Sequence, residues 1–166
     1  MLIRDVPDFP SPGVLFKDVT PWLADGAAFS SAIDTLARHF SARAVDVVVG
    51  VEARGFIVAS PVALALRTGF VPARKPGKLP WRVATREYSL EYGSGSLEIH
   101  EDAIRPGDRV VIVDDVLATG GTAGAAIALV EQLGGEVTGV GFLLELAHLG
   151  GRARLGDLDI CALEVV

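Results

Sequence analysis

Short apolar runs alternate with segments of helical spacing along most of the chain. The clearest run, residues 110–113, consists of four β-branched side chains, a composition typical of a strand buried inside a parallel sheet. Other apolar runs predict strands at residues 44–49, 70–74, 136–144 and 160–166. Apolar residues at steps of three and four predict helices over 25–40 and 123–133, and further helical segments over about 55–67 and 150–155. Pro61 is expected to kink the helix that contains it or to mark its first turn.

This alternation predicts the α/β class, with a central, mostly parallel sheet and helices on both of its faces. Two segments depart from it. Residues 1–21 contain four prolines, which disfavour helix and central strand, yet several apolar side chains predict that this segment packs against the domain. Residues 79–100 alternate polar and apolar positions around a Gly/Ser turn, which predicts a β-hairpin flap.

Length and charge narrow the possible functions. A chain of 166 residues is expected to form one domain over residues 1–166. Its net charge of −6 argues against a uniformly basic face for nucleic acid. The N-terminus has no apolar signal-peptide core and the apolar tracts are too short for a bilayer, so we expect no membrane partner. The single cysteine, Cys161, fits a reduced, cytoplasmic setting.

A ribose 5-phosphate site is predicted directly after the strand at 110–113. Adjacent carboxylates, Asp114 and Asp115, can accept hydrogen bonds from vicinal sugar hydroxyls or help to hold hydrated Mg²⁺. A loop of small residues then opens the helix, and its members are Ala118, Thr119, Gly120, Gly121 and Thr122. Glycines admit an anion close to backbone N–H groups, threonines add donors, and the helix N-terminus adds about half a positive charge. The alternative is a capped turn with two solvated aspartates.

Local cations are needed for an anionic substrate on this acidic chain. Arg54 follows Glu52 and Ala53 in a loop flanked by glycines, and a guanidinium fork there suits a phosphate. Three further cations, Arg74, Lys75 and Lys78, lie at or just after the end of the strand at 70–74. Each feature alone is also compatible with solvated surface residues.

Four blocks of sequence resemble one known family. D-D-V-L-A-T-G-G-T at 114–122 resembles the phosphoribosyl-pyrophosphate signature of the type I phosphoribosyltransferases, and G-V-E-A-R-G-F at 50–56 resembles their pyrophosphate loop. F-P-x-P-G-V-x-F-x-D at 9–18 and S-L-E-Y-G at 89–93 resemble the adenine-specific members. The resemblance extends over residues 9–152. It implies the type I phosphoribosyltransferase fold with a flexible hood, and a cis peptide bond near Glu52–Ala53.

The resemblance also implies an activity: adenine and 5-phospho-α-D-ribose 1-diphosphate give AMP and pyrophosphate. Mg²⁺ is then held mainly through the substrate, with Asp114 or Asp115 contributing through water, and the enzyme is a homodimer. Lys75 is assigned to the pyrophosphate, with Arg74 beside it or reaching across the dimer interface.

The catalytic residues implied are Glu91 and Tyr92 of the flap, with Glu91 as the candidate for proton transfer at the purine N9, and Arg54. The residues implied for the purine pocket are Leu15, Phe16, Lys17, Glu145 and Leu146. Many relatives have arginine at the position of Lys17, which matters only if the side chain, rather than the backbone, reads the base.

Two alternatives remain at this point. Enzymes for 6-oxopurines share the D-D-x-x-x-T-G-x-T core, but they need a cation near the purine O6, and no lysine follows the strand at 136–144 in such a position. A non-catalytic sensor of phosphoribosyl pyrophosphate would need a DNA-binding domain or a basic face, and the sequence shows neither.

Overall fold

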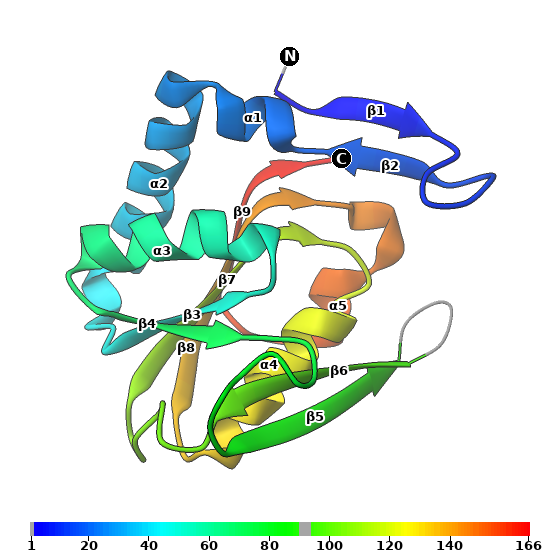
Figure 1. Cartoon of the computed structure of the whole chain (residues 1–166). Coiled ribbons are helices and arrows are strands. Elements are labelled where there is room, and N and C mark those ends of the chain that lie inside the picture. Colours follow the sequence, from blue (N-terminus) through cyan, green and yellow to red (C-terminus); the bar gives the residue numbers. More distant parts are fainter. Residues whose placement is uncertain (1, 90–93) are drawn as a thin grey trace.

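Five parallel strands form the central sheet, in the order β4-β3-β7-β8-β9 (Figure 1). The structure is a computed structural model that describes residues 2–89 and 94–166. The strands are β3 (Val47–Val51), β4 (Gly69–Ala73), β7 (Arg109–Leu117), β8 (Glu136–Glu145) and β9 (Ile160–Val165). All four neighbouring pairs are parallel. The predicted α/β fold with a parallel sheet is confirmed.

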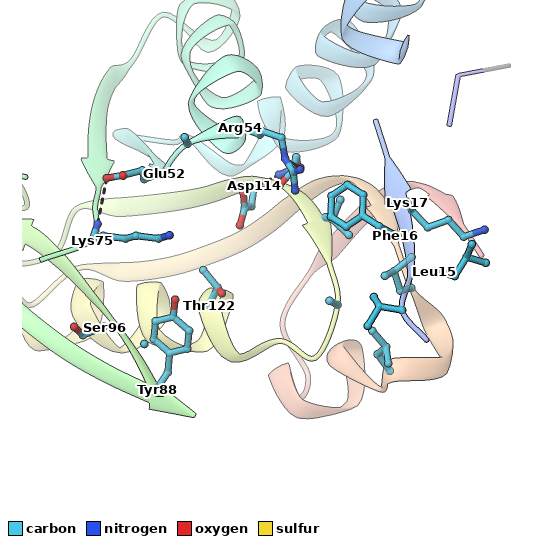
Figure 2. A pocket seen from close by; sticks show the side chains of 18 of the residues that line it. Leu15, Phe16, Lys17, Glu52, Arg54, Lys75, Tyr88, Ser96, Asp114 and Thr122 are labelled. Atoms are coloured by element: carbon cyan, nitrogen blue, oxygen red, sulfur yellow. Dashed lines mark hydrogen bonds and ion pairs between the residues drawn. The ribbon is translucent and has the colours of Figure 1, made fainter. Parts of the chain in front are cut away.

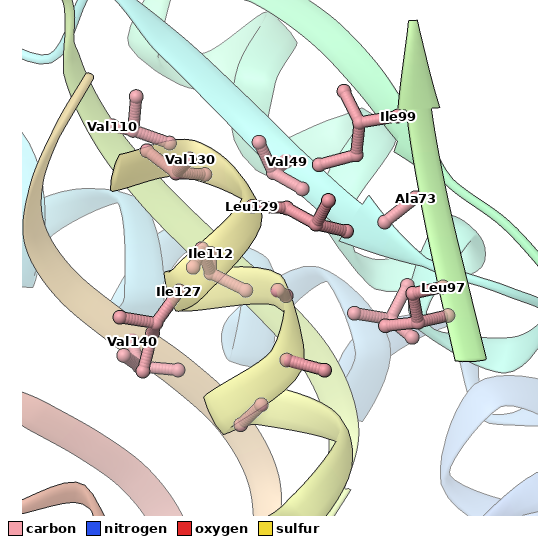
Figure 3. Packing of buried hydrophobic residues seen from close by; sticks show 14 of the residues in the cluster. Val49, Ala73, Leu97, Ile99, Val110, Ile112, Ile127, Leu129, Val130 and Val140 are labelled. Carbon is pink, nitrogen blue, oxygen red and sulfur yellow. The ribbon is translucent and has the colours of Figure 1, made fainter. Parts of the chain in front are cut away.

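Helices cover both faces of this sheet (Figure 1). One face carries α1 (Thr20–Ala24), α2 (Gly26–Phe40) and α3 (Arg54–Leu66), and the other carries α4 (Gly121–Gln132). Short helical turns η1 (Ser41–Arg43), η2 (Ala147–Leu149) and α5 (Gly151–Leu155) complete the set. Figure 3 shows Leu129 and Val130 of α4 packed with Ile112 of β7 in the larger of the two cores. Burial of these aliphatic side chains is what fixes the layers.

The apolar spacing in α2 explains its packing. Ile33, Leu36 and Phe40 are buried against the sheet, and the Asp25 side chain caps the helix by accepting the N–H of Ala28. In α3 the expectation about Pro61 as a first-turn residue is wrong. The loop after β3 consists only of Glu52 and Ala53, so α3 has already begun when it reaches Pro61 and continues through it.

The N-terminal segment forms a hairpin, β1 (Arg4–Pro7) with β2 (Leu15–Asp18), where the sequence predicted only turns. The prolines are compatible with it because of where they fall. Pro7 ends its strand, Pro10 lies in the connecting loop after a cis peptide bond, and Pro21 occupies the first turn of α1. None of these positions requires a backbone N–H in a sheet ladder.

The predicted flap contains β5 (Val83–Ser89) and β6 (Ser94–His100) as an antiparallel pair. Its base belongs to the core, since Ala84, Leu97 and Ile99 are buried beside α4. The β-hairpin predicted for this segment is therefore present and is anchored to the domain at its base. Among the helices that the structure describes, none is both long and apolar enough to cross a membrane.

Candidate functional site

A cavity of about 1220 Å³ opens at the carboxyl ends of the parallel strands (Figure 2). Walls come from β2, the loop after β3, the turn after β4, the β5–β6 hairpin, β7, the start of α4 and the segment after β8. Ligands of open α/β sheets bind at this edge. The predicted site residues that line it are Leu15, Phe16, Lys17, Glu52, Ala53, Arg54, Lys75, Asp114, Asp115, Ala118, Thr122 and Leu146.

The remaining predicted residues lie elsewhere. Thr119, Gly120 and Gly121 surround an adjoining hollow of about 50 Å³ at the start of α4, shared with Asp114 and Thr122. The side chains of Arg74, Lys78 and Glu145 are not part of the cavity wall. Glu91 and Tyr92 lie outside the residues that the structure describes.

The two aspartates lie inside β7, not after it as the sequence suggested, because the strand continues to Leu117. Both are buried, and Asp114 Oδ1 accepts the backbone N–H of Asp115 at 2.8 Å. Burial, and then the neighbouring charge of Asp115, raise the pKa of Asp114 well above its usual value of 3.8. Gly55 approaches so closely that a Cβ there would lie 2.5 Å from Asp114 Oδ1.

Arg54 bridges the acidic pair and the N-terminal hairpin. Its Nε atom lies 2.5 Å from Asp115 Oδ2, and its guanidinium carbon lies 5.3 Å from the centre of the Phe16 ring. The contact with Asp115 is an ion pair without an aligned hydrogen bond, since Oδ2 has no hydrogen-bond partner within the described residues. The Arg54 guanidinium and the Asp115 carboxylate can therefore each form hydrogen bonds with a ligand in the cavity.

Glu52 holds two loops together at the opposite side of the cavity. Its Oε2 accepts from Arg74 Nε at 2.8 Å and from the backbone N–H of Lys75 at 3.2 Å. Arg74 also donates to the Lys78 carbonyl, so its guanidinium is engaged within the chain. The Lys75 amine faces the cavity (Figure 2). The peptide bond between Glu52 and Ala53 is cis, as the resemblance implied.

The small-residue loop presents the N-terminus of α4 to the cavity. Gly120 has φ +78°, a backbone conformation that favours glycine, and α4 begins at the next residue. Backbone N–H groups at a helix start have no intrahelical acceptor, so they can bind an anion together with the Thr122 hydroxyl.

Comparisons with known proteins agree with this geometry. The family described as "Phosphoribosyl transferase domain" matches residues 23–162. The adenine phosphoribosyltransferase of Acidothermus cellulolyticus is 59% identical over 92% of this chain and 86% of its own. The chain belongs to the adenine phosphoribosyltransferase family.

Solved structures of that family superpose on the whole chain. The adenine phosphoribosyltransferase of Thermoanaerobacter pseudethanolicus has a TM-score of 0.95 and 52% identity, covering 99% of this chain and 96% of that one. The Saccharomyces cerevisiae enzyme, complexed with D-2,5-dideoxy-2,5-imino-altritol 1,6-bisphosphate and adenine, has a TM-score of 0.91 and 42% identity, covering 98% and 94%.

In this member of the adenine phosphoribosyltransferase family, the cavity has walls that sequence reasoning missed. From the hairpin come Tyr88 and Ser96, and from the segment after β8 come His148 and Leu149. Ser96 lies on the opposite face of the hairpin from the buried Leu97, whereas Tyr88 shares the face of Ala84 and packs against the core as well as lining the cavity. His148 and Leu149 follow the recognised Glu145–Leu146 pair, but nothing in their spacing pointed to a ligand.

Proposed function

We propose that this chain converts adenine and 5-phospho-α-D-ribose 1-diphosphate to AMP and pyrophosphate. The observation that carries the proposal is that one cavity joins the acidic pair of β7, the start of α4, the cations Arg54 and Lys75, and the apolar side chains of β2. A sugar, its 5-phosphate, its diphosphate and a planar base each have a chemically matched wall there. The relatives' names support the same reaction.

Breaking the bond between C1 and the pyrophosphate oxygen builds positive charge on the sugar and negative charge on the leaving group. Asp114 and Asp115 are proposed to hold the ribose hydroxyls near the developing cation. Arg54 and Lys75 are proposed to neutralise the pyrophosphate. The β5–β6 hairpin would exclude water, which otherwise captures the sugar cation, and Glu91 is our candidate for accepting the N9 proton.

The base is proposed to lie between Leu15 and Leu146, with its edge on the backbone of residues 15–17. Adenine presents a ring acceptor beside an amino donor, which a backbone N–H and C=O can match. A 6-oxopurine needs a cation beside its O6. The Lys17 amine is instead paired with Asp5 Oδ1 at 2.7 Å, which supports adenine as the base. In Figure 2 its side chain is directed away from Asp114 and Thr122.

Mg²⁺ is part of the proposal, because the residues present fit it. Carboxylate oxygens are its preferred protein ligands, and the buried Asp115 Oδ2 has no hydrogen-bond partner within the described part of the chain. No group of three or more His, Cys, Asp or Glu side chains gathers for a metal within residues 2–89 and 94–166. The ion would therefore be held largely by substrate oxygens and water, with Asp114 or Asp115 as outer contacts. When bound, it would help to neutralise the diphosphate.

A homodimer acting in the cytoplasm completes the proposal. The outer side of α3, which begins at the cavity with Arg54, exposes Ile57 by 47% and Leu64 by 78%. These two side chains lie seven positions apart, on the same face of the helix, where the surface of a second subunit would cover them. The cytoplasm is expected because a sugar that carries a phosphate and a diphosphate does not cross a membrane unaided.

The test is a steady-state assay with Mg²⁺, phosphoribosyl pyrophosphate and each purine base in turn, on wild type, Asp115→Asn and the control Asp34→Asn. Asp34 is exposed on α2, so its variant should match wild type. We expect AMP from adenine, no product from hypoxanthine or guanine, and loss of turnover in Asp115→Asn. Product from a 6-oxopurine would overturn the base assignment. Binding of phosphoribosyl pyrophosphate without turnover of any base would support the sensor instead.

A further inference from the structure

One turn, residues 146–151, contributes to both the base wall and the support of the phosphate loop. Leu146, His148 and Leu149 line the cavity. Behind the loop, Gly151 lies so close to the Ala118 carbonyl that any Cβ would overlap it, and a Cβ on Gly120 would lie 2.9 Å from the Gly151 carbonyl oxygen. A displacement of this turn would therefore shift the base wall and the phosphate loop at the same time.

Backbone hydrogen bonds tie this turn to the rest of the domain at its start. Gly150 and Gly156, with φ of +68° and +70°, flank α5, and neither has a neighbour within 4 Å of its Cβ position. The Leu146 N–H donates to the Leu117 carbonyl and the Ala147 N–H to the Val166 carbonyl, both at 2.8 Å, whereas the N–H groups of Leu149 and Gly150 bond to carbonyls within the turn. Leu155 is buried at the far end. The middle of the turn needs another tie.

Arg152 supplies that tie. Its Nε atom lies 3.1 Å from both carboxylate oxygens of Glu145, its NH2 group lies 2.5 Å from Oε2, and NH1 donates to the Ile160 carbonyl at 3.2 Å. The Glu145 side chain is only 6% exposed, whereas Arg152 is 46% exposed. A buried carboxylate without its partner is strongly unfavourable, so Arg152 holds α5 firmly to the end of β8 and to the start of β9.

We propose that Arg152 is a positioning residue that sets the base wall and the phosphate loop at once, acting through Glu145 and the 146–151 turn. It corrects the expectation that Glu145 faces the purine, because that carboxylate is turned to Arg152 and not to the cavity. The inference rests on the proposed function for its substrates. Arg152 does not line the cavity itself.

The experiment compares Arg152→Gln and Arg152→Lys with Arg38→Gln, a control on the exposed side of α2. We measure kcat, both KM values, Tm, and the affinity for ribose 5-phosphate by calorimetry. Arg152→Gln should raise the KM for adenine and for phosphoribosyl pyrophosphate by about tenfold or more, since small misplacements of positioning walls carry penalties of this order. Arg152→Lys, which keeps a charge but loses the fork, should fall between Gln and wild type.

A purely structural role predicts a different result: Tm falls while both KM values stay at the wild-type level, and that result overturns the proposal. Should Arg152→Gln fail to fold, Arg152→Lys is judged by the same criterion. If wild type does not turn over adenine, the proposed function fails, but Arg152 is still tested by ribose 5-phosphate, whose affinity should fall in Arg152→Gln and not in Arg38→Gln. Unchanged affinity overturns the role of Arg152.

Discussion

The Nε atom of Arg54 lies 2.5 Å from Oδ2 of Asp115, across the floor of the cavity. These two groups have opposite proposed partners, pyrophosphate for the guanidinium and ribose hydroxyls for the carboxylate. Without substrate they neutralise each other, which lessens the penalty of holding Asp115 beside Asp114 in a buried place. Binding of substrate is then an exchange of partners, in which both groups keep hydrogen-bonding or charged neighbours.

Arg54→Gln should lower kcat/KM for phosphoribosyl pyrophosphate by on the order of 10²-fold, the usual effect of removing one charged or hydrogen-bonding group from a developing anion. Steady-state kinetics at saturating adenine measure this. Arg67→Gln is the matched control, because Arg67 is exposed just beyond the other end of α3. Equal kinetics of Arg54→Gln and Arg67→Gln would rule out a role for Arg54 at the leaving group.

Asp114→Asn should make the protein more stable at neutral pH while removing activity. The raised pKa of Asp114 means that folding favours its protonated form, so its stabilising contribution is full below 3.8 and is lost as pH rises through the folded pKa. An asparagine keeps an oxygen for the Asp115 N–H without the charge. Urea unfolding at several pH values should show an advantage of the variant at pH 7 that shrinks toward pH 4. A variant less stable than wild type at pH 7 would contradict this.

Gly55→Ala should reduce both stability and activity, because its Cβ would lie 2.5 Å from Asp114 Oδ1 and 3.1 Å from Asp114 Cα. Overpacking of this kind costs about 1–3 kcal/mol. Gly26→Ala in the first turn of α2 is the control, since nothing lies within 4 Å of that position. There alanine should leave activity unchanged and raise stability by up to about 1 kcal/mol. Thermal unfolding and the adenine assay measure both, and wild-type behaviour of Gly55→Ala would contradict the close approach.

The layers of the fold could be predicted because they depend on local pattern. The β-branched run of β7 and the three- and four-residue steps of α2 each identify a buried face without knowledge of the partner. The N-terminal hairpin could not be predicted in this way. Its prolines disfavour strands, and only the pairing of β1 with β2 decides that they fall at tolerated positions.

In the candidate site, the motifs identified the functional side chains, but their burial and their hydrogen-bond partners depend on the packing of other elements. The Asp114–Asp115 pair was evident in the sequence, but its burial depends on Gly55 of α3, which approaches from another element. Glu145 matched a short motif, yet its carboxylate binds Arg152, a partner seven positions along that only the turn between them brings near. Side-chain partners formed across turns are not encoded in local periodicity.

Asp46→Asn should lower Tm at neutral pH, because Asp46 joins the start of β3 to the start of β7 through Arg109. Hydrogen bonds from the Arg109 side chain and backbone lower the pKa of Asp46 from 3.8 to about 2. A carboxylate whose pKa is lowered by folding stabilises the folded protein at every pH above its pKa in the unfolded chain. This stabilisation is lost as the pH falls through the pKa in the folded protein. The difference in Tm between wild type and Asp46→Asn should thus be constant above about pH 5 and should shrink between 3.8 and about 2. Circular dichroism melts across that range, with Asp34→Asn as an exposed control, measure it. A difference independent of pH would mean that Asp46 acts through shape and not through its charge.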